Sequence, residues 1–360
     1  MRRRRTRARV IAITTLLACL LTLPAAADDA VFQIFDEAVI QWDKLRPERI
    51  APDGFVLRHA GHRVSRTLDL PPAPVTTANA RRIIATVRAD PVYTIRDGRR
   101  FPNDPWTRLG TVTVEVRDDE GLVREAEIMR FITPYGASAV FEQDVTALAP
   151  LLAGTVTING AIASYSDEPG WRLSVELRYC EEGAGHRRPT FAFPVFTEPR
   201  LHAEMPRLLA EVTVPSGLDP PRLRVISTGH ATDGEARHEF VSCPHVLRID
   251  GVEVARWRPW SEFGGVLRAA NPTGGRLVIG GREIRASDLD RSGWHPGLVV
   301  EPLLIPVPEL TPGRHEIEIE VLGIRPKDPP DEKGKEHHGY WSISVIAVAD
   351  RAWGVEADGR

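Results

Sequence analysis

Alternation of apolar and polar residues with a period of two is the feature that most limits what this chain can fold into. Leu173, Val175, Leu177 and Tyr179 alternate with polar and charged residues, and residues 316–321 alternate glutamates with apolar residues. Strands of this kind bury one face and expose the other to water, as in antiparallel sheets. The pattern therefore predicts an all-β protein.

Turn signals recur between the alternating segments. The dipeptides Asp97-Gly98, Asp250-Gly251 and Gly280-Gly281 favour tight turns, and the last two separate short apolar runs, which predicts hairpins. The 30 prolines and 29 glycines suit many short strands joined by ordered loops. No long segment has a helical period. Residues 144–152 are expected to form a turn or two of helix, limited by Pro150.

A polar, glycine-containing segment at residues 181–188 has alternating strands on both sides and predicts a domain boundary. We expect an N-terminal domain over residues 28–183, a C-terminal domain over residues 184–352 and a short tail over residues 353–360, at usual domain sizes. Sandwiches or jelly rolls fit this composition. The pattern alone does not separate a jelly roll from an immunoglobulin-like sandwich.

The first 27 residues have the form of a secretory signal peptide. A cluster of arginines precedes an apolar run over residues 10–23, and small residues lead to a predicted cleavage site after Ala27. The run is shorter than the roughly 20 residues that a membrane span needs, so no span is predicted. The protein is expected to be secreted or periplasmic. A loose lipid-attachment motif ending at Cys19 leaves lipidation as the alternative.

Cysteine and charge content bear on disulfide formation and on the expected partners. Cys180 and Cys243 remain after cleavage, and an oxidising compartment permits a disulfide between them, with two free thiols as the alternative. The 46 Lys+Arg residues nearly balance the 49 Asp+Glu residues, and no basic stripe lies in the predicted domains. Nucleic acid is therefore not an expected partner.

Two short motifs carry the functional signal. Residues 104–108 place Asp104 beside Trp106 and Arg108, just before a predicted strand. Residues 130–135, Arg-Phe-Ile-Thr-Pro-Tyr, end another strand and turn. In this order and at this separation they resemble the peptide-N-glycosidase F family, bacterial amidases that remove N-linked glycans from asparagine. Further colinear matches lie at residues 31–36, 142–146, 151–154, 229–231, 239–245, 270–272 and 290–297.

The resemblance implies two jelly rolls packed side by side and a monomeric amide-bond hydrolase without a cofactor. Its partners would be N-linked glycoproteins or glycopeptides. Water must attack the amide carbonyl, which requires a base and stabilisation of the oxyanion. By resemblance, Asp104 is the principal catalytic carboxylate and Glu239 the second. Without the family context, Asp104 would be interpreted as a loop residue that caps a turn.

The resemblance also implies the residues that bind substrate. Arg291 matches a family arginine that reaches the sugar and the catalytic water, and its guanidinium offers forked donors. Trp106, Trp294 and His230 complete the predicted site, the two indoles as apolar walls or stacking surfaces. Core packing is the more frequent role of tryptophan in general.

One departure from the family keeps a second function open. The family's third acidic residue falls on Ala163 in this chain. This favours, as the alternative, a glycan-binding or surface-interaction protein without turnover, and a structural cell-envelope protein is a third interpretation. The pair His59 and His62 has a spacing seen in metal sites, but no acidic or thiolate partner follows at diagnostic spacing. No metal site is predicted.

Overall fold

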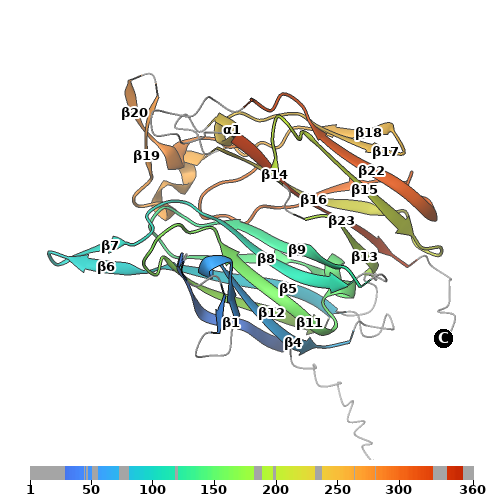
Figure 1. Cartoon of the computed structure of the whole chain (residues 1–360), viewed down its shortest axis with the longest axis horizontal. Coiled ribbons are helices and arrows are strands. Elements are labelled where there is room, and N and C mark those ends of the chain that lie inside the picture. The colour runs from blue at the N-terminus through green and yellow to red at the C-terminus, as the bar shows by residue number, and fades with distance from the viewer. Residues whose placement is uncertain are drawn as a thin grey trace, which may run out of the picture.

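The computed structural model describes residues 29–43, 45, 48–50, 56–72, 81–117, 121–181, 189–197, 200–231, 237–262, 264–279, 281–326 and 339–351. Antiparallel strands dominate these residues, as predicted. Figure 1 shows the sheets as layers of two sandwiches, with two hairpins projecting at one end of the molecule. The predicted signal peptide, the tail and most of the predicted boundary segment lie outside the described residues.

The first sandwich consists of two sheets. One sheet has the strand order β1 (Ala30–Ile40), β12 (Trp171–Glu181), β5 (Arg81–Pro91) and β10 (Ala139–Asp144). The other has the order β2 (Arg49–Ile50), β3 (Val56–Arg58), β4 (Arg63–Leu70), β11 (Gly154–Ile162), β8 (Leu109–Arg117) and β9 (Val123–Ile132). A 3-10 turn, η1 (His59–Gly61), joins β3 to β4, and η3 (Thr146–Leu151) forms the helical turn expected there.

The second sandwich also has two sheets. The inner sheet has the order β13 (Pro189–Phe196), β23 (Gly339–Asp350), β16 (Arg222–Ala231) and β21 (Leu303–Pro306), with β14 (Arg200–Leu201) paired to β23. The outer sheet has the order β15 (Arg207–Val214), β22 (Gly313–Val321), β17 (His245–Ile249) and β18 (Val252–Trp257). The short helical segments are α1 (Arg237–Phe240), η4 (Gly264–Ala270) and η5 (Ala286–Asp288).

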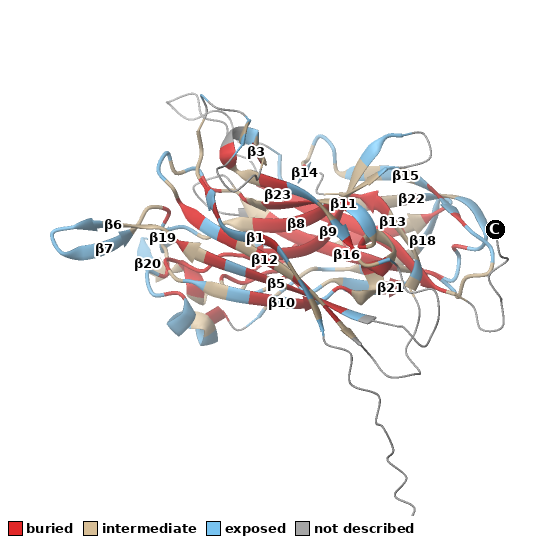
Figure 2. Ribbon diagram, turned by 90° about the horizontal axis from the view of Figure 1, so that it is seen from below, coloured by how far each residue is buried: buried red, intermediate tan, exposed pale blue. Residues whose placement is uncertain are grey.

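The alternation of apolar and polar residues in the sequence corresponds to alternating burial along the strands. Leu173, Val175 and Leu177 of β12 are buried, and so are Ile317 and Ile319 of β22. Figure 2 shows the buried residues concentrated on the strands in the middle of the molecule, where the sheets face one another. Each sandwich therefore has its own apolar core.

The predicted turns close hairpins. Asp250 and Gly251 have φ values of 50° and 79°, which permits the tight turn between β17 and β18. The Asp97-Gly98 turn joins β6 (Tyr93–Arg96) to β7 (Arg99–Pro102). Around the last turn signal, β19 (Arg276–Ile279) pairs with β20 (Arg282–Arg285). The β6–β7 and β19–β20 hairpins project at the same end of the molecule (Figure 1).

Two buried arginines cross the boundary between the sandwiches in opposite directions. Arg130 of β9 forms a two-point ion pair with Glu127 at 2.7 and 2.6 Å. The same guanidinium donates to the hydroxyl of Thr228 at 2.8 Å and to the carbonyl of Ser342 at 2.7 Å in the second sandwich. Arg224 of β16 donates back to the carbonyl of Glu127 at 3.0 Å. Polar groups therefore join the sandwiches across a buried interface.

Both cysteines are free thiols: Cys180 is half-buried in the first sandwich and Cys243 is buried in the second. The disulfide that export would permit is not formed, and the alternative of two free thiols holds. No helix among the described residues is long and apolar enough to cross a membrane.

Removal of the Glu127 charge should destabilise the whole molecule. Both partners of the pair are 0% exposed, so Glu127→Gln leaves the Arg130 charge buried without its counterion. We expect a loss of about 3–5 kcal/mol in the free energy of unfolding, measured by urea denaturation. Arg314→Ala is the control because its ion pair with Glu211 is exposed. Equal midpoints for the two variants would contradict the interpretation.

Candidate functional site

Asp104 lies at the end of the first sandwich and is only 1% exposed. Arg108 holds both of its carboxylate oxygens with a fork of two hydrogen bonds of 2.8 Å. The Ser164 hydroxyl donates to it at 2.6 Å and the Trp171 indole at 3.3 Å. The backbone N–H of Trp106 also points to it at 3.4 Å, as in the capping interpretation. Asp104 is thus an enclosed, ion-paired carboxylate.

Glu239 and Arg291, predicted from separate segments, form a direct ion pair. Glu239 belongs to α1, and its side chain is 18% exposed, whereas Arg291 is fully buried. The Arg291 guanidinium also donates to the carbonyl of Ala286 at 2.7 Å and to the Tyr135 hydroxyl at 3.3 Å. Its Nε has no hydrogen-bond partner among the described residues. Burial lowers the pKa of Arg291, and Tyr135 acts in the opposite direction.

Aromatic rings extend from this ion pair along the junction of the sandwiches. The Arg291 guanidinium lies 4.4 Å from the centre of the Trp294 ring. His230 stacks between Trp294 at 5.6 Å and Tyr340 at 5.3 Å. Arg200 covers Tyr340 at 4.9 Å. A continuous row of rings and guanidinium groups therefore runs from Glu239 to β14.

His230 is a neutral member of this row. Burial lowers its pKa to about 3, and the positive charges of Arg130, Arg200 and Arg291 act in the same direction. Its Nε2 lies 2.8 Å from the hydroxyl of Thr228, the same hydroxyl that receives Arg130. The stacked imidazole therefore presents an uncharged ring at neutral pH.

A polar cavity of about 300 Å³ lies beside the far end of the row. Arg200 from the second sandwich and His62, Ala163 and Tyr165 from the first line it. Tyr165 is 51% exposed, and the Arg108 guanidinium lies over its ring, 5.3 Å from the ring centre. Ala163, where the family's third acid would lie, therefore belongs to the wall of this cavity.

A small apolar cluster connects the two parts of the site. Ile132 of the first sandwich packs with Ile226, Trp294 and Val300 of the second, and Leu109 packs against the cluster. Leu109 directly follows Arg108, the partner of Asp104. The partners of the two predicted carboxylates, Arg108 and Arg291, are therefore both next to residues of this cluster. No hydrogen bond or ion pair joins Asp104 to Glu239 in the part of the chain that the structure describes.

The two predicted tryptophans, Trp294 and Trp106, lie in different surroundings. Trp294 is 4% exposed and belongs to the junction, whereas Trp106 is 51% exposed and stands apart from the aromatic row. Sequence reasoning missed Arg108, Tyr340 and Arg200, because an arginine or a tyrosine at a strand end carries no signal of its contacts. Arg108 was part of the motif at residues 104–108, but only the fold shows that its guanidinium binds both oxygens of Asp104.

The histidines within the described ranges are not grouped for metal binding. His59 and His62 were singled out in the sequence for their spacing. Burial lowers the pKa of His62, and the charges of Arg108 and His59 act in the same direction. Among the described residues, no group of three His, Cys, Asp or Glu side chains is arranged to hold a metal ion.

Comparisons with known proteins agree with this architecture. Residues 200–348, which contain Glu239 and Arg291, match the family described as "Peptide-N-glycosidase F, C terminal". The structure of PNGF-II in the P21 space group matches with a TM-score of 0.73 and 20% identity, over 90% of this chain and 66% of that one. This chain thus spans slightly less than two thirds of the length of PNGF-II. Curated protein sequences give no match.

PNGase F itself has the same fold. The glycosylasparaginase from Flavobacterium meningosepticum matches with a TM-score of 0.63 and 19% identity, over 92% of this chain and 98% of that one. The fold is therefore that of an all-β protein with two jelly-roll domains side by side. The family match places residues 200–348 in the peptide-N-glycosidase F family.

Asp104→Asn should reduce stability because the carboxylate is enclosed. The substitution removes the counterion of Arg108 and places an amide N–H₂ among groups that are all donors. We expect a loss of about 2–3 kcal/mol, measured by urea unfolding. The variant Asp167→Asn, at an exposed neighbouring position, is the control. Wild-type stability of Asp104→Asn would instead support an accessible, non-structural carboxylate.

His230 should make the protein acid-sensitive. In the unfolded chain it takes up a proton below a pKa of about 6.5, whereas the folded protein resists protonation until about pH 3. Its contribution is therefore complete above pH 6.5 and is lost as the pH falls, by at most about 1.4 kcal/mol per pH unit. The melting temperature of His230→Phe should fall less steeply than that of wild type between about pH 6.5 and pH 4. Parallel curves would contradict this.

Proposed function

We propose that this chain is a glycopeptide amidase that hydrolyses the β-aspartylglucosaminyl amide bond and releases N-linked glycans from glycoproteins. The observation that carries the proposal is the Glu239–Arg291 ion pair, which lies within the residues that match the family. Two side chains predicted to act together from separate segments are in contact. The proposed protein is secreted or periplasmic, acts as a monomer and uses no cofactor.

Hydrolysis requires a water molecule to attack the amide carbonyl carbon and a proton to reach the leaving nitrogen. The C–N bond then breaks to give an aspartate side chain and a glycosylamine. In the proposal, Arg291 supplies N–H donors and positive charge to the sugar or the developing oxyanion. Glu239 accepts hydrogen bonds and orients the water and the sugar. Its pairing with Arg291 stabilises the charged carboxylate, which suits positioning more than proton abstraction.

Asp104 receives a changed role in this proposal. All the groups around its oxygens are donors, and Arg108 occupies both oxygens. Because these donors take up both oxygens, we assign to Asp104 the positioning of Arg108 beside Tyr165 at the polar cavity. Trp294 and His230 form the stacked wall of the site, and Trp106 provides an exposed indole outside it.

Glycan binding without turnover is the second candidate. The specific observation in its favour is that both predicted carboxylates are ion-paired and that Ala163 lies where the family has its third acid. A protein that only binds glycans needs no basic group to activate water. The two candidates share the same pocket and differ only in the fate of the amide bond.

A release assay decides between the two candidates. Purified protein is incubated with denatured N-glycoproteins carrying high-mannose, complex and truncated glycans across a wide pH range. The amidase should lower the apparent mass of the glycoprotein and convert the glycosylated asparagine to aspartate, detected by mass spectrometry. Binding of the same glycopeptides without release supports the second candidate. If the protein neither releases nor binds these glycans, both candidates are refuted.

Glu239→Gln should lower glycan release by about 10²–10³-fold, the effect expected for the loss of a group that orients charge in the transition state. The folded fraction must be checked by circular dichroism, because the substitution leaves Arg291 buried without its counterion. Glu168→Ala is the control, since Glu168 is an exposed acid near the first sandwich's end of the site. Unchanged release by folded Glu239→Gln would contradict its assigned role.

A further inference from the structure

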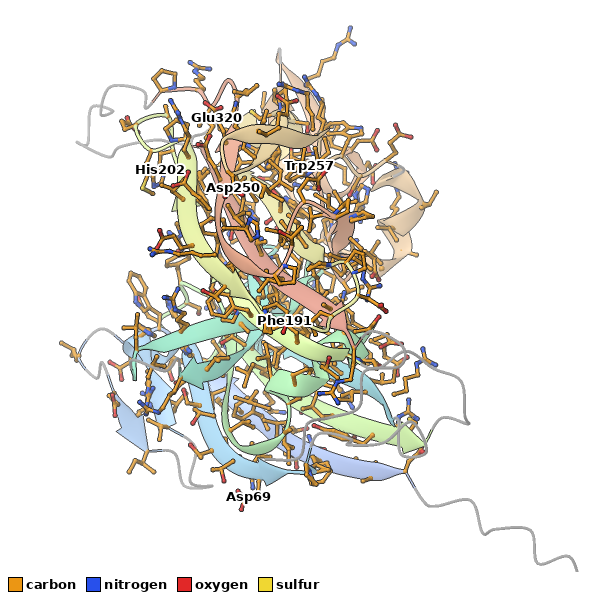
Figure 3. All side chains as sticks on the ribbon, turned by 90° about the vertical axis from the view of Figure 1, so that its right-hand side faces the viewer. Asp69, Phe191, His202, Asp250, Trp257 and Glu320 are labelled. Atoms are coloured by element: carbon orange, nitrogen blue, oxygen red, sulfur yellow. The ribbon has the colours of Figure 1, made fainter. Side chains whose placement is uncertain are left out.

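A second cavity opens at one edge of the second sandwich and shares Trp294 with the site described above. Its volume is about 480 Å³, within the range typical of small-molecule sites. Strands β18 and β21 are edge strands of the two sheets, and Trp257 and Leu303 from these strands line the cavity. Figure 3 shows the labelled Trp257 in the second sandwich, far from Asp69 of the first.

Tryptophans dominate the lining. Trp257, Trp260 and Trp294 are three of the eight tryptophans in the chain, and all three face this one cavity. Trp260 is 42% exposed, although a large apolar ring gains free energy by burial. Because Trp260 lines the cavity and remains exposed, its ring is accessible to a ligand there. A flat indole matches the C–H face of a pyranose ring.

The polar lining residues carry opposite charges. Arg258 supplies guanidinium donors, Glu301 supplies carboxylate acceptors, and Ser261 supplies a hydroxyl. The two charges cancel, so the cavity gives no net attraction to an ionic ligand. Donors and acceptors beside aromatic faces fit a neutral, hydroxyl-rich molecule. One Arg258 nitrogen is anchored to the carbonyl of Ser242 at 2.9 Å, which fixes the orientation of its fork.

The cavity adjoins the proposed glycan site. Ser261 and Arg291 exchange backbone hydrogen bonds of 2.8 and 3.0 Å. Trp294 lines the cavity, while the Arg291 guanidinium lies over its ring at 4.4 Å. One indole thus forms a common wall between the cavity and the ion pair that binds near the amide.

We infer that this cavity is a second saccharide subsite, which binds neutral pyranose units of an N-linked glycan beyond the two sugars nearest asparagine. The inference rests on the proposed function for the identity of the glycan. Trp257 and Trp260 stack on the sugar, and Arg258 and Glu301 bind its hydroxyls. The subsite extends glycan recognition from Arg291 to the cavity, and the Trp294 indole lies between the two.

Binding of free oligosaccharides tests the subsite independently of turnover. A high-mannose oligosaccharide and N,N′-diacetylchitobiose are titrated into wild type, Trp260→Ala, Arg258→Ala and Arg256→Ala by calorimetry. Trp260→Ala and Arg258→Ala should each weaken binding of the long oligosaccharide at least five- to ten-fold, for a loss of about 1–1.4 kcal/mol each. Affinity for the disaccharide should not change. Arg256→Ala is the matched control, because this exposed arginine lies two residues earlier and pairs with Glu253.

The outcomes separate the subsite from the proposed function. Trp260-dependent binding of the long oligosaccharide supports the subsite even where wild type releases no glycan. Release by wild type together with unchanged binding by folded Trp260→Ala and Arg258→Ala overturns the subsite and leaves the amidase standing. Failure of wild type to bind the long oligosaccharide more tightly than the disaccharide also overturns it. Melting temperatures confirm that each variant is folded.

Discussion

The buried ion pair between Glu127 and Arg130 is the interaction on which the rest of the structure depends. It lies at the contact between the sandwiches, where both groups are 0% exposed. A buried pair of charges is tolerated only when the remaining donors and acceptors are satisfied. The second sandwich supplies those partners through Thr228, Ser342 and Ser344. The arrangement of the two domains is therefore tied to hydrogen bonds that only this docking provides.

The residues that follow Arg130 carry this constraint to the functional site. Phe131 packs in the first core, and Ile132 joins the junction cluster with Trp294. Tyr135 receives a hydrogen bond from Arg291, the partner of Glu239. One short segment thus links the interdomain ion pair to the candidate site. A shift of the sandwiches would move Arg291 and the aromatic row relative to the first domain.

The site shows where reasoning from sequence stops. The segments carrying Glu239 and Arg291 were identified separately, and the fold brings the two side chains into contact. Asp104 was predicted as the principal catalytic carboxylate, but a sequence shows a carboxylate and not its neighbours. Arg108, Ser164 and Trp171 surround Asp104 through contacts that lie 4, 60 and 67 residues away. Those contacts enclose Asp104 and pair it with Arg108.

The sequence by itself determined the all-β class, the hairpin turns and the apolar faces of the alternating strands. These properties are local, since period-two alternation and turn dipeptides act over a few residues. Only the tertiary structure decided that the cysteines stay unpaired, that the two arginines Arg130 and Arg224 join the domains, and that tryptophans from residues 257 to 294 line one cavity. The reason is physical: burial, ion pairing and cavity shape depend on residues that are distant in the chain and meet only when both sandwiches dock.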